Sequence, residues 1–329
     1  MKKIFASVYP FGKYEPACLK VLKTTGYELI QSPHKRKLSP LELVDYGRDA
    51  DVLIAGTENL EPYIHSNSNL KFISRVGIGL DSVPLKLCRE KGIRVSYTPD
   101  AVTMAVAEMT VGLILILLRK LQLADMEIRS GAWTRYVGKR IENINIGIVG
   151  FGRIGKALTR LLSSFRPKSI LVYDIKDKTP EINQYQKQYS INLRALNLHD
   201  LYRESDIISL HVPLYHKTRD MIGIEELKMM KKDICLINTA RGGIIRESDL
   251  LQYLKGNQEA SAAIDVFTKE PYFGDLKELS NIFLSQHMGS CSIDCRINME
   301  LQAAEEAVRF ILGQKLHSEV PDEEYEYQD

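Results

Sequence analysis

Residues 145–174 read NIGIVGFGRIGKALTRLLSSFRPKSILVYD, and this stretch decides the fold because it combines a strand, a glycine turn, a helix and a second strand. The apolar run at residues 146–149 predicts the first strand, and Gly150, Gly152 and Gly155 follow it with the spacing G-x-G-x-x-G. In that spacing the first glycine allows a tight turn, the second lets a pyrophosphate approach the backbone, and the third lets the helix pack against the strand. The helix N-terminus then directs its free N–H groups toward the anion. The stretch therefore predicts a dinucleotide-binding turn.

Asp174 ends the predicted second strand, nineteen residues after Gly155. A carboxylate at this position can accept hydrogen bonds from an adenosine ribose and repels a 2′-phosphate, so the sequence favours NAD over NADP. Lys176 and Lys178 would soften that repulsion if their loop folded back. The alternative is a glycine turn that binds nothing, but the strand, helix, second strand and acid in register favour the binding turn.

Length and composition restrict the classes of protein that this chain can be. At 329 residues it exceeds the usual size of one domain, so we expect two. The apolar content of 44% and the charged content of 26% are typical of a globular protein, and a net charge of +2 gives no general attraction to nucleic acid or to a membrane surface. The N-terminus does not resemble a secretory signal.

The most apolar stretch, residues 109–118, is about half the length that a membrane span needs, so it predicts a buried helix. The five cysteines are odd in number and scattered, which predicts reduced thiols and a cytoplasmic location.

Strand-like and helical patterns alternate along the chain, as in parallel α/β folds. A first domain is predicted at residues 1–98, completed by a C-terminal helix at 294–329. A second domain is predicted at 99–293, beginning with a crossover helix and the segment around Trp133. The predicted strands lie at residues 4–8, 27–30, 52–55, 72–76 and 93–97 of the first domain, and at 146–149, 170–173, 207–212, 234–238, 262–266 and 282–285 of the second.

Six strands are the number in a doubly wound dinucleotide-binding sheet, so we predict an α/β protein with a Rossmann-type doubly wound parallel sheet and a second, smaller α/β domain. The basic run HKRK at residues 34–37 is interpreted as a solvated loop. The last twelve residues, SEVPDEEYEYQD, carry six acids and no base, and we expect them to form a solvated, disordered tail.

Three loops that follow predicted strands of the second domain carry polar residues suited to chemistry. NTARGG at 238–243 contains Arg241, whose guanidinium can hold a carboxylate through two hydrogen bonds; the alternative is a surface arginine in a turn. AIDVFTKEP at 263–271 contains Asp265 and Glu270, and SQHMGS at 285–290 contains His287. Ligands of open α/β sheets bind at the carboxyl ends of strands, and a histidine paired with a carboxylate is a common proton-transfer couple. A buried structural histidine is the alternative.

His287, Cys291 and Cys295 lie four residues apart, which on a helix would place them on one face and suggest a metal site. Gly289 and Ser290 instead indicate a loop, and a fourth ligand is not evident. We therefore predict no metal.

Several motifs in the same order resemble the D-2-hydroxyacid dehydrogenases, with short phosphoglycerate dehydrogenases that lack a regulatory domain among the most similar in appearance. The resemblance runs from Phe72 to Leu312. Its motifs are RVGIGLDSV from Arg75, GIVGFGRIGKAL from Gly147, HVPLYHKTRDMIG from His211, LINTARGGIIRESDL from Leu236, IDVFTKEP from Ile264, and His287. Departures are Ser285-Gln286 where the family often has Thr-Pro, and Ser82 and Pro84 in the loop after Gly79.

The resemblance implies a role for each matching residue. Arg241 would bind the substrate carboxylate and keto oxygen, His287 would be the acid/base, and Glu270 would hydrogen-bond His287. Arg75 would lie near a substrate phosphate or carboxylate, and the backbone of Val76, Gly77 and Gly79 would meet the substrate carboxylate. The implied cofactor-binding residues are Gly150, Gly152, Arg153, Ile154, Gly155, Asp174, Val212, Pro213, Thr218, Thr239, Ala240 and, near the nicotinamide, Asp265.

The resemblance also implies the activity: an NAD-dependent oxidoreductase that interconverts a D-2-hydroxy acid and its 2-oxo acid, 3-phosphoglycerate among the candidate substrates. It further implies a flavodoxin-like substrate domain, an active site in the cleft between the domains, and a homodimer formed through the Rossmann domain. Two alternatives stay open. One is the same chemistry on a non-phosphorylated, sugar-derived or phosphonate acid, and the other is an NAD(H)-sensing, corepressor-like interaction protein.

Overall fold

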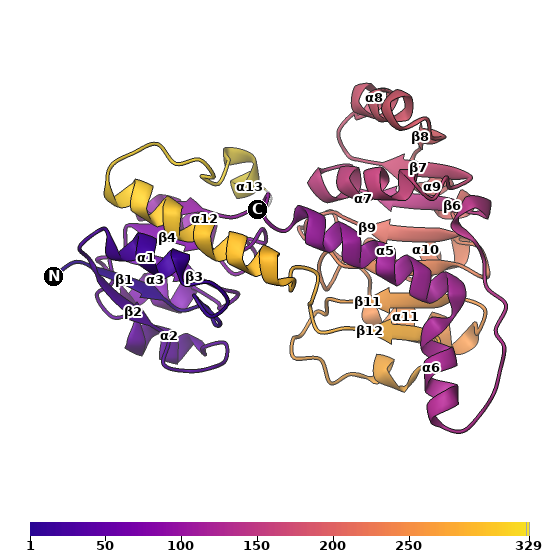
Figure 1. Ribbon diagram of the computed structural model, residues 1–329, viewed down its shortest axis with the longest axis horizontal. Coiled ribbons are helices and arrows are strands. Elements are labelled where there is room, and N and C mark those ends of the chain that lie inside the picture. Colours follow the sequence, from indigo (N-terminus) through magenta and orange to yellow (C-terminus); the bar gives the residue numbers. More distant parts are fainter. Residues whose placement is uncertain (327, 329) are drawn as a thin grey trace. The chain divides into compact units, whose positions relative to one another are not determined.

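The computed structural model describes residues 1–326 and 328, and the chain forms two compact units (Figure 1). Unit 1 comprises Met1–Val102 and Ser290–Asp329, and unit 2 comprises Thr103–Gly289. The boundaries between the units thus lie after residues 102 and 289, whereas the sequence predicts domain boundaries after residues 98 and 293. The first boundary lies where helix α5 (Thr103–Arg119) begins.

Unit 1 is built on a parallel five-stranded sheet in the order β2-β1-β3-β4-β5, the flavodoxin-like order. Its central strands are buried along their whole length, because helices cover both faces of the sheet. The strands are β1 (Lys3–Ala6), β2 (Glu28–Gln31), β3 (Val52–Ala55), β4 (Phe72–Arg75) and β5 (Arg94–Ser96); the helices are α1 (Ala17–Lys23), α2 (Pro40–Tyr46), α3 (Glu61–Ser66), α4 (Leu85–Glu90), α12 (Ile293–Ile311) and α13 (Asp322–Glu326).

Helix α12 packs on this sheet although nearly 200 residues of unit 2 precede it. Phe310 stacks on Phe72 of β4 with ring centroids 4.5 Å apart, and Ser74 Oγ donates to the Ala303 carbonyl at 2.9 Å. The C-terminal part of the chain thereby completes the core of unit 1.

The expectation of a disordered C-terminal tail is wrong for the described residues. Val320 is buried in the core of unit 1, and Glu319 pairs with Arg94 at 2.7 Å. Residues 322–326 form α13, and Gln328 Nε2 donates to the Leu80 carbonyl at 2.9 Å. Composition suggested disorder because the tail is acidic, but the arginines that bind its acids lie far away in sequence. Residues 327 and 329 lie outside the described residues.

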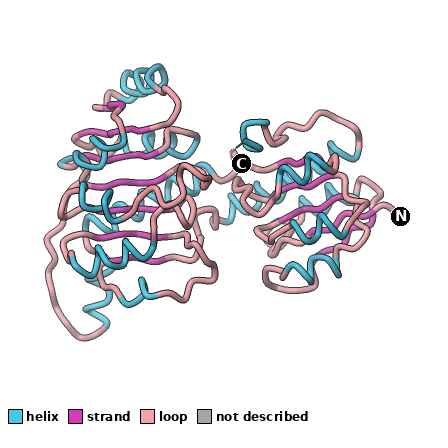
Figure 2. Tube along the Cα trace, turned by 180° about the vertical axis from the view of Figure 1, so that it is seen from behind, coloured by secondary structure: helices cyan, strands magenta, loops and turns pink. Residues whose placement is uncertain are grey.

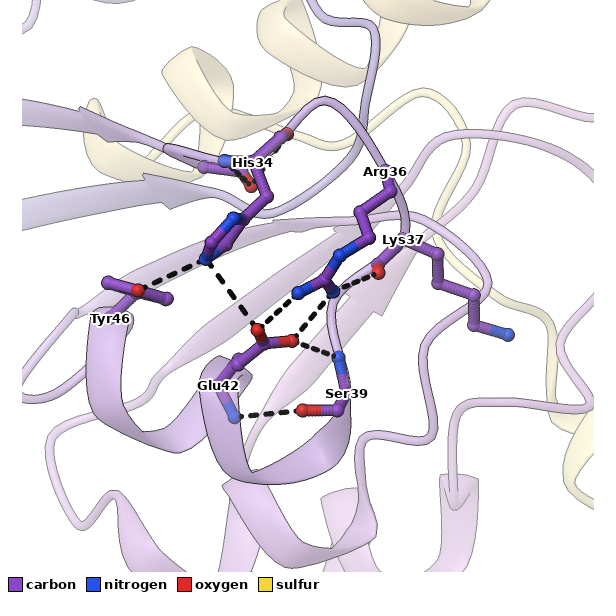
Figure 3. A network of polar contacts seen from close by, with 7 residues as sticks. His34, Arg36, Lys37, Ser39, Glu42 and Tyr46 are labelled. Atoms are coloured by element: carbon purple, nitrogen blue, oxygen red, sulfur yellow. Dashed lines mark hydrogen bonds and ion pairs between the residues drawn. The ribbon is translucent and has the colours of Figure 1, made fainter.

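The basic loop between β2 and α2 is exposed to solvent at residues 35–37, as the sequence predicts, and a polar network joins it to α2 (Figure 3). Ser39 and Glu42 form a capping box at the start of α2, and Arg36 binds the Glu42 carboxylate through both terminal nitrogens, at 2.8 and 2.6 Å. The Arg36 hydrogen bond lowers the pKa of Glu42 well below its ordinary value. His34 Nε2 hydrogen-bonds the Tyr46 hydroxyl at 3.1 Å. Residues 31–35 and the chain after β1 line a cavity of about 440 Å³.

Unit 2 is a parallel seven-stranded sheet in the order β12-β11-β10-β9-β6-β7-β8, with helices on both faces (Figure 2). This confirms the Rossmann-type doubly wound sheet. The strands are β6 (Asn145–Val149), β7 (Ser169–Tyr173), β8 (Leu193–Ala195), β9 (Ile207–Leu210), β10 (Cys235–Asn238), β11 (Ser261–Ile264) and β12 (Ile282–Leu284). The α-helices are α5, α6 (Leu121–Arg129), α7 (Arg153–Ser163), α8 (Thr179–Tyr189), α9 (Leu198–Glu204), α10 (Ile224–Met229) and α11 (Glu247–Gly256).

The sequence analysis missed edge strand β8, because only one of its three side chains is buried and no apolar pattern marks it. The two faces of the sheet carry separate apolar cores, one of them beneath α5 and α7. Strand order reverses between β6 and β9, and in open α/β sheets ligands bind at such a switch point. Among the described helices, none is both long and apolar enough to cross a membrane.

Candidate active site

The glycine turn lies at the carboxyl end of β6, at the switch point of the unit 2 sheet. Gly150 has φ +100°, and a Cβ added there would lie 2.4 Å from the His211 carbonyl oxygen. A Cβ on Gly155 would lie 2.1 Å from the Gly150 carbonyl oxygen, so α7 could not pack as it does. A Cβ on Gly152, the N-cap residue of α7, would meet nothing within 4 Å. Space thus remains beside Gly152 at the helix N-terminus, which fits a dinucleotide's pyrophosphate.

Asp174 follows β7 and bridges two loops beside the glycine turn. Its Oδ2 accepts the Phe151 N–H at 2.8 Å and its Oδ1 accepts the Lys176 N–H at 2.9 Å. A carboxylate has about four acceptor sites, so these two bonds leave capacity for ribose hydroxyls. Lys178 pairs with Glu181 at 3.3 Å, which weakens the case for its binding a 2′-phosphate.

The loop after β9 is fixed by its own side chains. Thr218 Oγ1 donates to the Pro213 carbonyl at 2.6 Å and accepts the Tyr215 N–H at 2.9 Å, so this buried threonine shapes the turn that begins at Val212. His211, one residue earlier, hydrogen-bonds Ser209 Oγ through Nε2 at 2.9 Å. Its Nδ1 is buried and has no hydrogen-bond partner among the described residues. Burial lowers the pKa of His211 to about 4.

Arg241 lies in a turn that Asn238, the last residue of β10, holds in place. The Asn238 side chain accepts the Ala240 N–H at 3.0 Å and donates to the Arg241 carbonyl at 2.8 Å. The half-buried Arg241 donates from Nη1 to the Ala240 carbonyl at 2.6 Å. Thr239 Oγ1 lies 3.4 Å from the Thr110 hydroxyl of α5. Sequence reasoning missed Asn238, although an Asn at a strand end is a common turn residue.

His287 and Glu270 form the pair that the sequence suggested. Nδ1 of His287 lies 2.9 Å from Oε2 and 3.1 Å from Oε1 of Glu270, and both side chains are nearly 40% exposed. Glu270 Oε1 also accepts the Phe267 N–H at 3.1 Å, which fixes the carboxylate. The carboxylate thus holds Nδ1 and orients the imidazole ring.

Asp265 is fully buried at the end of β11 and holds the loop that carries His287. Its carboxylate accepts the Ser285 hydroxyl at 2.6 Å, the Met288 N–H at 2.8 Å and the Gly289 N–H at 2.9 Å. Its carbonyl accepts the His287 N–H at 2.7 Å, and His287 has φ +52°. Ser285, which stands where the family often has threonine before proline, thus has the Asp265 carboxylate as its hydrogen-bond partner.

The loop of residues 75–79, in unit 1, follows β4. The Val76 N–H donates to the Ala55 carbonyl at 2.9 Å, and the Gly77 N–H donates to Thr98 Oγ1 at 2.7 Å. The N–H groups of Ile78 and Gly79 find no acceptor within the described part of the chain. Sequence reasoning did not single out Ile78.

The residues considered for a metal site do not share a helix. Helix α12 begins at Ile293, so His287 and Cys291 precede it and the four-residue spacing does not stack them. Burial raises the pKa of Cys295 to about 11, which disfavours the thiolate that binds metals. Within residues 1–326 and 328, no group of three His, Cys, Asp or Glu side chains could hold a metal ion.

Comparisons with known proteins agree with this geometry. Residues 111–289 match the family model for the D-isomer specific 2-hydroxyacid dehydrogenase, NAD binding domain. A glyoxylate reductase from Thermococcus litoralis is 34% identical over 83% of this chain and 84% of its own length. A D-3-phosphoglycerate dehydrogenase from Methanocaldococcus jannaschii is 34% identical over 84% of this chain and 53% of its own. The crystal structure of the TT0316 protein from Thermus thermophilus superimposes with a TM-score of 0.84 at 27% identity, covering 97% of this chain and all of that one.

The glycine turn, the acid after β7 and the histidine–glutamate pair thus occur in a chain whose sequence relatives are reductases and dehydrogenases of 2-oxo and 2-hydroxy acids. NAD is the cofactor that the family model names and that the space beside Gly152 fits. The chain belongs to the D-isomer specific 2-hydroxyacid dehydrogenases and is an NAD-dependent enzyme of that family.

Proposed function

We propose that this enzyme reduces a small, unphosphorylated 2-oxo acid, such as glyoxylate or hydroxypyruvate, with NADH. The observation that carries the choice of substrate is the burial of Arg75, the residue first considered for a substrate phosphate. Its guanidinium is directed at carbonyl groups of its own loop. Relatives named glyoxylate reductase, from Thermococcus litoralis and Thermofilum pendens, and hydroxypyruvate reductase, from Thermotoga maritima, support the proposal.

The reaction assigns a separate task to each side chain. Bound NADH supplies a hydride to C2 of the 2-oxo acid. Arg241 orients the acid and stabilises the negative charge that develops on the carbonyl oxygen. His287 donates a proton from Nε2 to that oxygen, and Glu270 holds Nδ1 and so orients the ring for the transfer. Oxidation of the hydroxy acid reverses these steps.

Within unit 1, the backbone N–H groups of Ile78 and Gly79 would bind the substrate carboxylate. Two uncommitted N–H groups next to one another are suited to an anion. This assignment replaces Val76 and Gly77 as donors, because their N–H groups already have acceptors.

The test is NADH oxidation, followed by absorbance, with glyoxylate, hydroxypyruvate, pyruvate and 3-phosphohydroxypyruvate. We expect the highest kcat/KM with one of the first two. A kcat/KM at least tenfold higher with 3-phosphohydroxypyruvate would reject the proposal in favour of a phosphoglycerate dehydrogenase, the activity named for the Methanocaldococcus relative. NADH binding without turnover of any acid would instead favour the NAD(H)-sensing alternative.

We also propose that the enzyme is a cytoplasmic homodimer. Large apolar side chains are exposed on and after α6, among them Ile128 at 56%, Trp133 at 81% and Val137 at 89%. Such side chains gathered on one segment suit an interface between two copies. A monomer mass in light scattering at micromolar concentration would reject the dimer.

A further inference from the structure

Arg75 is the last residue of β4 and is only 7% exposed, an unusual environment for a guanidinium. Its Nε donates to the Gly79 carbonyl at 2.9 Å, and its Nη1 donates to the Val76 carbonyl. The side chain therefore joins the two ends of the short loop that follows its own strand. A buried charge of this kind requires hydrogen-bond acceptors, and the loop backbone supplies them.

Gly77 shows how closely the loop surrounds this guanidinium. Its φ is +133°, and an added Cβ would lie 2.7 Å from Arg75 Nη1. Thr98, fully buried, holds the same glycine from the other side: its hydroxyl accepts the Gly77 N–H at 2.7 Å and its N–H donates to the Gly77 carbonyl at 3.0 Å. The loop is thus fixed by Arg75 and by Thr98, through different atoms.

These hydrogen bonds occupy most of the backbone polar groups of the loop and leave two N–H groups without an acceptor among the described residues. The carbonyls of Val76, Gly77 and Gly79 are acceptors for Arg75 and Thr98, and the N–H groups of Val76 and Gly77 are donated to Ala55 and Thr98. The N–H groups of Ile78 and Gly79 are left as adjacent donors, and the Arg75 guanidinium adds a positive charge to the same loop. Charge and donors together favour an anion.

We propose that Arg75 is a positioning residue, which holds the Ile78 and Gly79 N–H groups in the conformation that binds the substrate carboxylate and does not itself bind a substrate phosphate. The proposal rests on the proposed function and deepens it. A guanidinium that turned away from the loop toward a phosphate would break its hydrogen bonds to the Gly79 and Val76 carbonyls, which would release the loop. The chain's substrate is therefore recognised by the carboxylate common to all 2-oxo acids.

The test compares Arg75→Met and Arg75→Lys with glyoxylate, hydroxypyruvate and 3-phosphohydroxypyruvate. Carboxylate binding contributes equally to ground and transition states, so its weakening raises KM more than it lowers kcat. We expect Arg75→Met to raise KM by about 10- to 100-fold, the range for loss of charge-assisted hydrogen bonds, and by the same factor for every acid. Arg75→Lys, which keeps the charge but lacks the guanidinium fork, should recover part of the loss.

Two further variants separate positioning from general damage. Thr98→Val removes the acceptor of the Gly77 N–H while leaving Arg75 in place, and should also raise KM for all acids. Arg36→Met is the matched control, because it removes an arginine of the same unit whose hydrogen bonds go to Glu42 and Lys37 (Figure 3). It should leave KM unchanged. The Kd for NADH should be unchanged in every variant.

A loss confined to 3-phosphohydroxypyruvate, or an unchanged KM in Arg75→Met, would overturn the proposal. If the wild-type enzyme reduces none of the three acids, the proposed function fails, and the positioning role is then tested by calorimetric binding of oxalate in the presence of NAD. Weaker oxalate binding in both Arg75→Met and Thr98→Val supports the positioning role, and unchanged binding rejects it.

Discussion

Replacing Asp265 with asparagine should release the loop that carries His287. The wild-type carboxylate is fully buried, and its two oxygens accept three donors from that loop: Ser285 Oγ and the Met288 N–H on Oδ1, and the Gly289 N–H on Oδ2. Asparagine has nearly the same shape but only one acceptor oxygen. Its NH₂ group must therefore face at least one of the three donors.

The magnitude follows from counting these bonds. In the better orientation the amide oxygen keeps Ser285 and Met288, and the NH₂ opposes the Gly289 N–H. An unpaired buried donor costs about 1–3 kcal/mol, and each retained bond falls from about 1.5–3 to about 0.5–1.5 kcal/mol when the acceptor loses its charge. We expect a loss of about 3–5 kcal/mol in the free energy that keeps the loop closed. Ser285→Ala, which removes one hydrogen bond to the charged carboxylate, should lose about 1.5–3 kcal/mol.

The assay is hydrogen exchange of the Gly289 amide in the absence of cofactor, together with the urea midpoint of unfolding. Activity alone would not suffice, because Asp265 is also a candidate to lie near the nicotinamide. Gly289 exchange should accelerate strongly in Asp265→Asn and less in Ser285→Ala, with kcat falling in the same order. Exchange and urea midpoint both equal to those of the wild type would refute the idea that this carboxylate holds the loop.

Three other predictions concern the cofactor turn, acid stability and catalysis. Gly155→Ala puts a Cβ 2.1 Å from the Gly150 carbonyl oxygen and should lower both Tm and NADH affinity. The Cβ of Gly152→Ala would meet no protein atom within 4 Å, so this variant should bind NADH more weakly with an unchanged Tm. Calorimetry and thermal melts measure both effects, and equal Tm losses in the two variants would contradict this prediction. His211 has a folded pKa of about 4 against an ordinary 6.5, so the unfolded chain takes up a proton first and stability falls as pH drops from 6.5 to 4, by up to about 3 kcal/mol. Unfolding of His211→Leu should lack this part of the pH dependence, and identical slopes would argue against a neutral buried histidine. His287→Gln should lose most of kcat while NADH binding is kept, and an unchanged pH–rate profile would remove His287 from the acid/base role.

Local patterns in the sequence were sufficient for the features that depend on neighbouring residues. The glycine spacing, the apolar strands and the acid after β7 predicted the doubly wound sheet, because a turn and its flanking elements are set by backbone sterics and periodicity. Arg241, Glu270 and His287 were predicted from their position after strands, and the structure pairs the last two at 2.9 Å. The roles given to them stay predictions.

Other features were decided only by contacts between distant residues. Strand β8 pairs at the sheet edge without an apolar pattern. The described residues of the acidic tail are held on unit 1 because Glu319 pairs with Arg94 and Val320 packs in the core. The orientation of Arg75 could not be read from its neighbours, since a guanidinium can reach a ligand or a carbonyl equally well. Which backbone N–H groups stay available for an anion depends on where Ala55 and Thr98 lie in the folded sheet, and sequence spacing carries no information on that. The sequence alone determined the type of site, whereas tertiary hydrogen bonding decided which atoms it presents, because a polar group binds a ligand only with the hydrogen-bonding capacity that the fold has not already used.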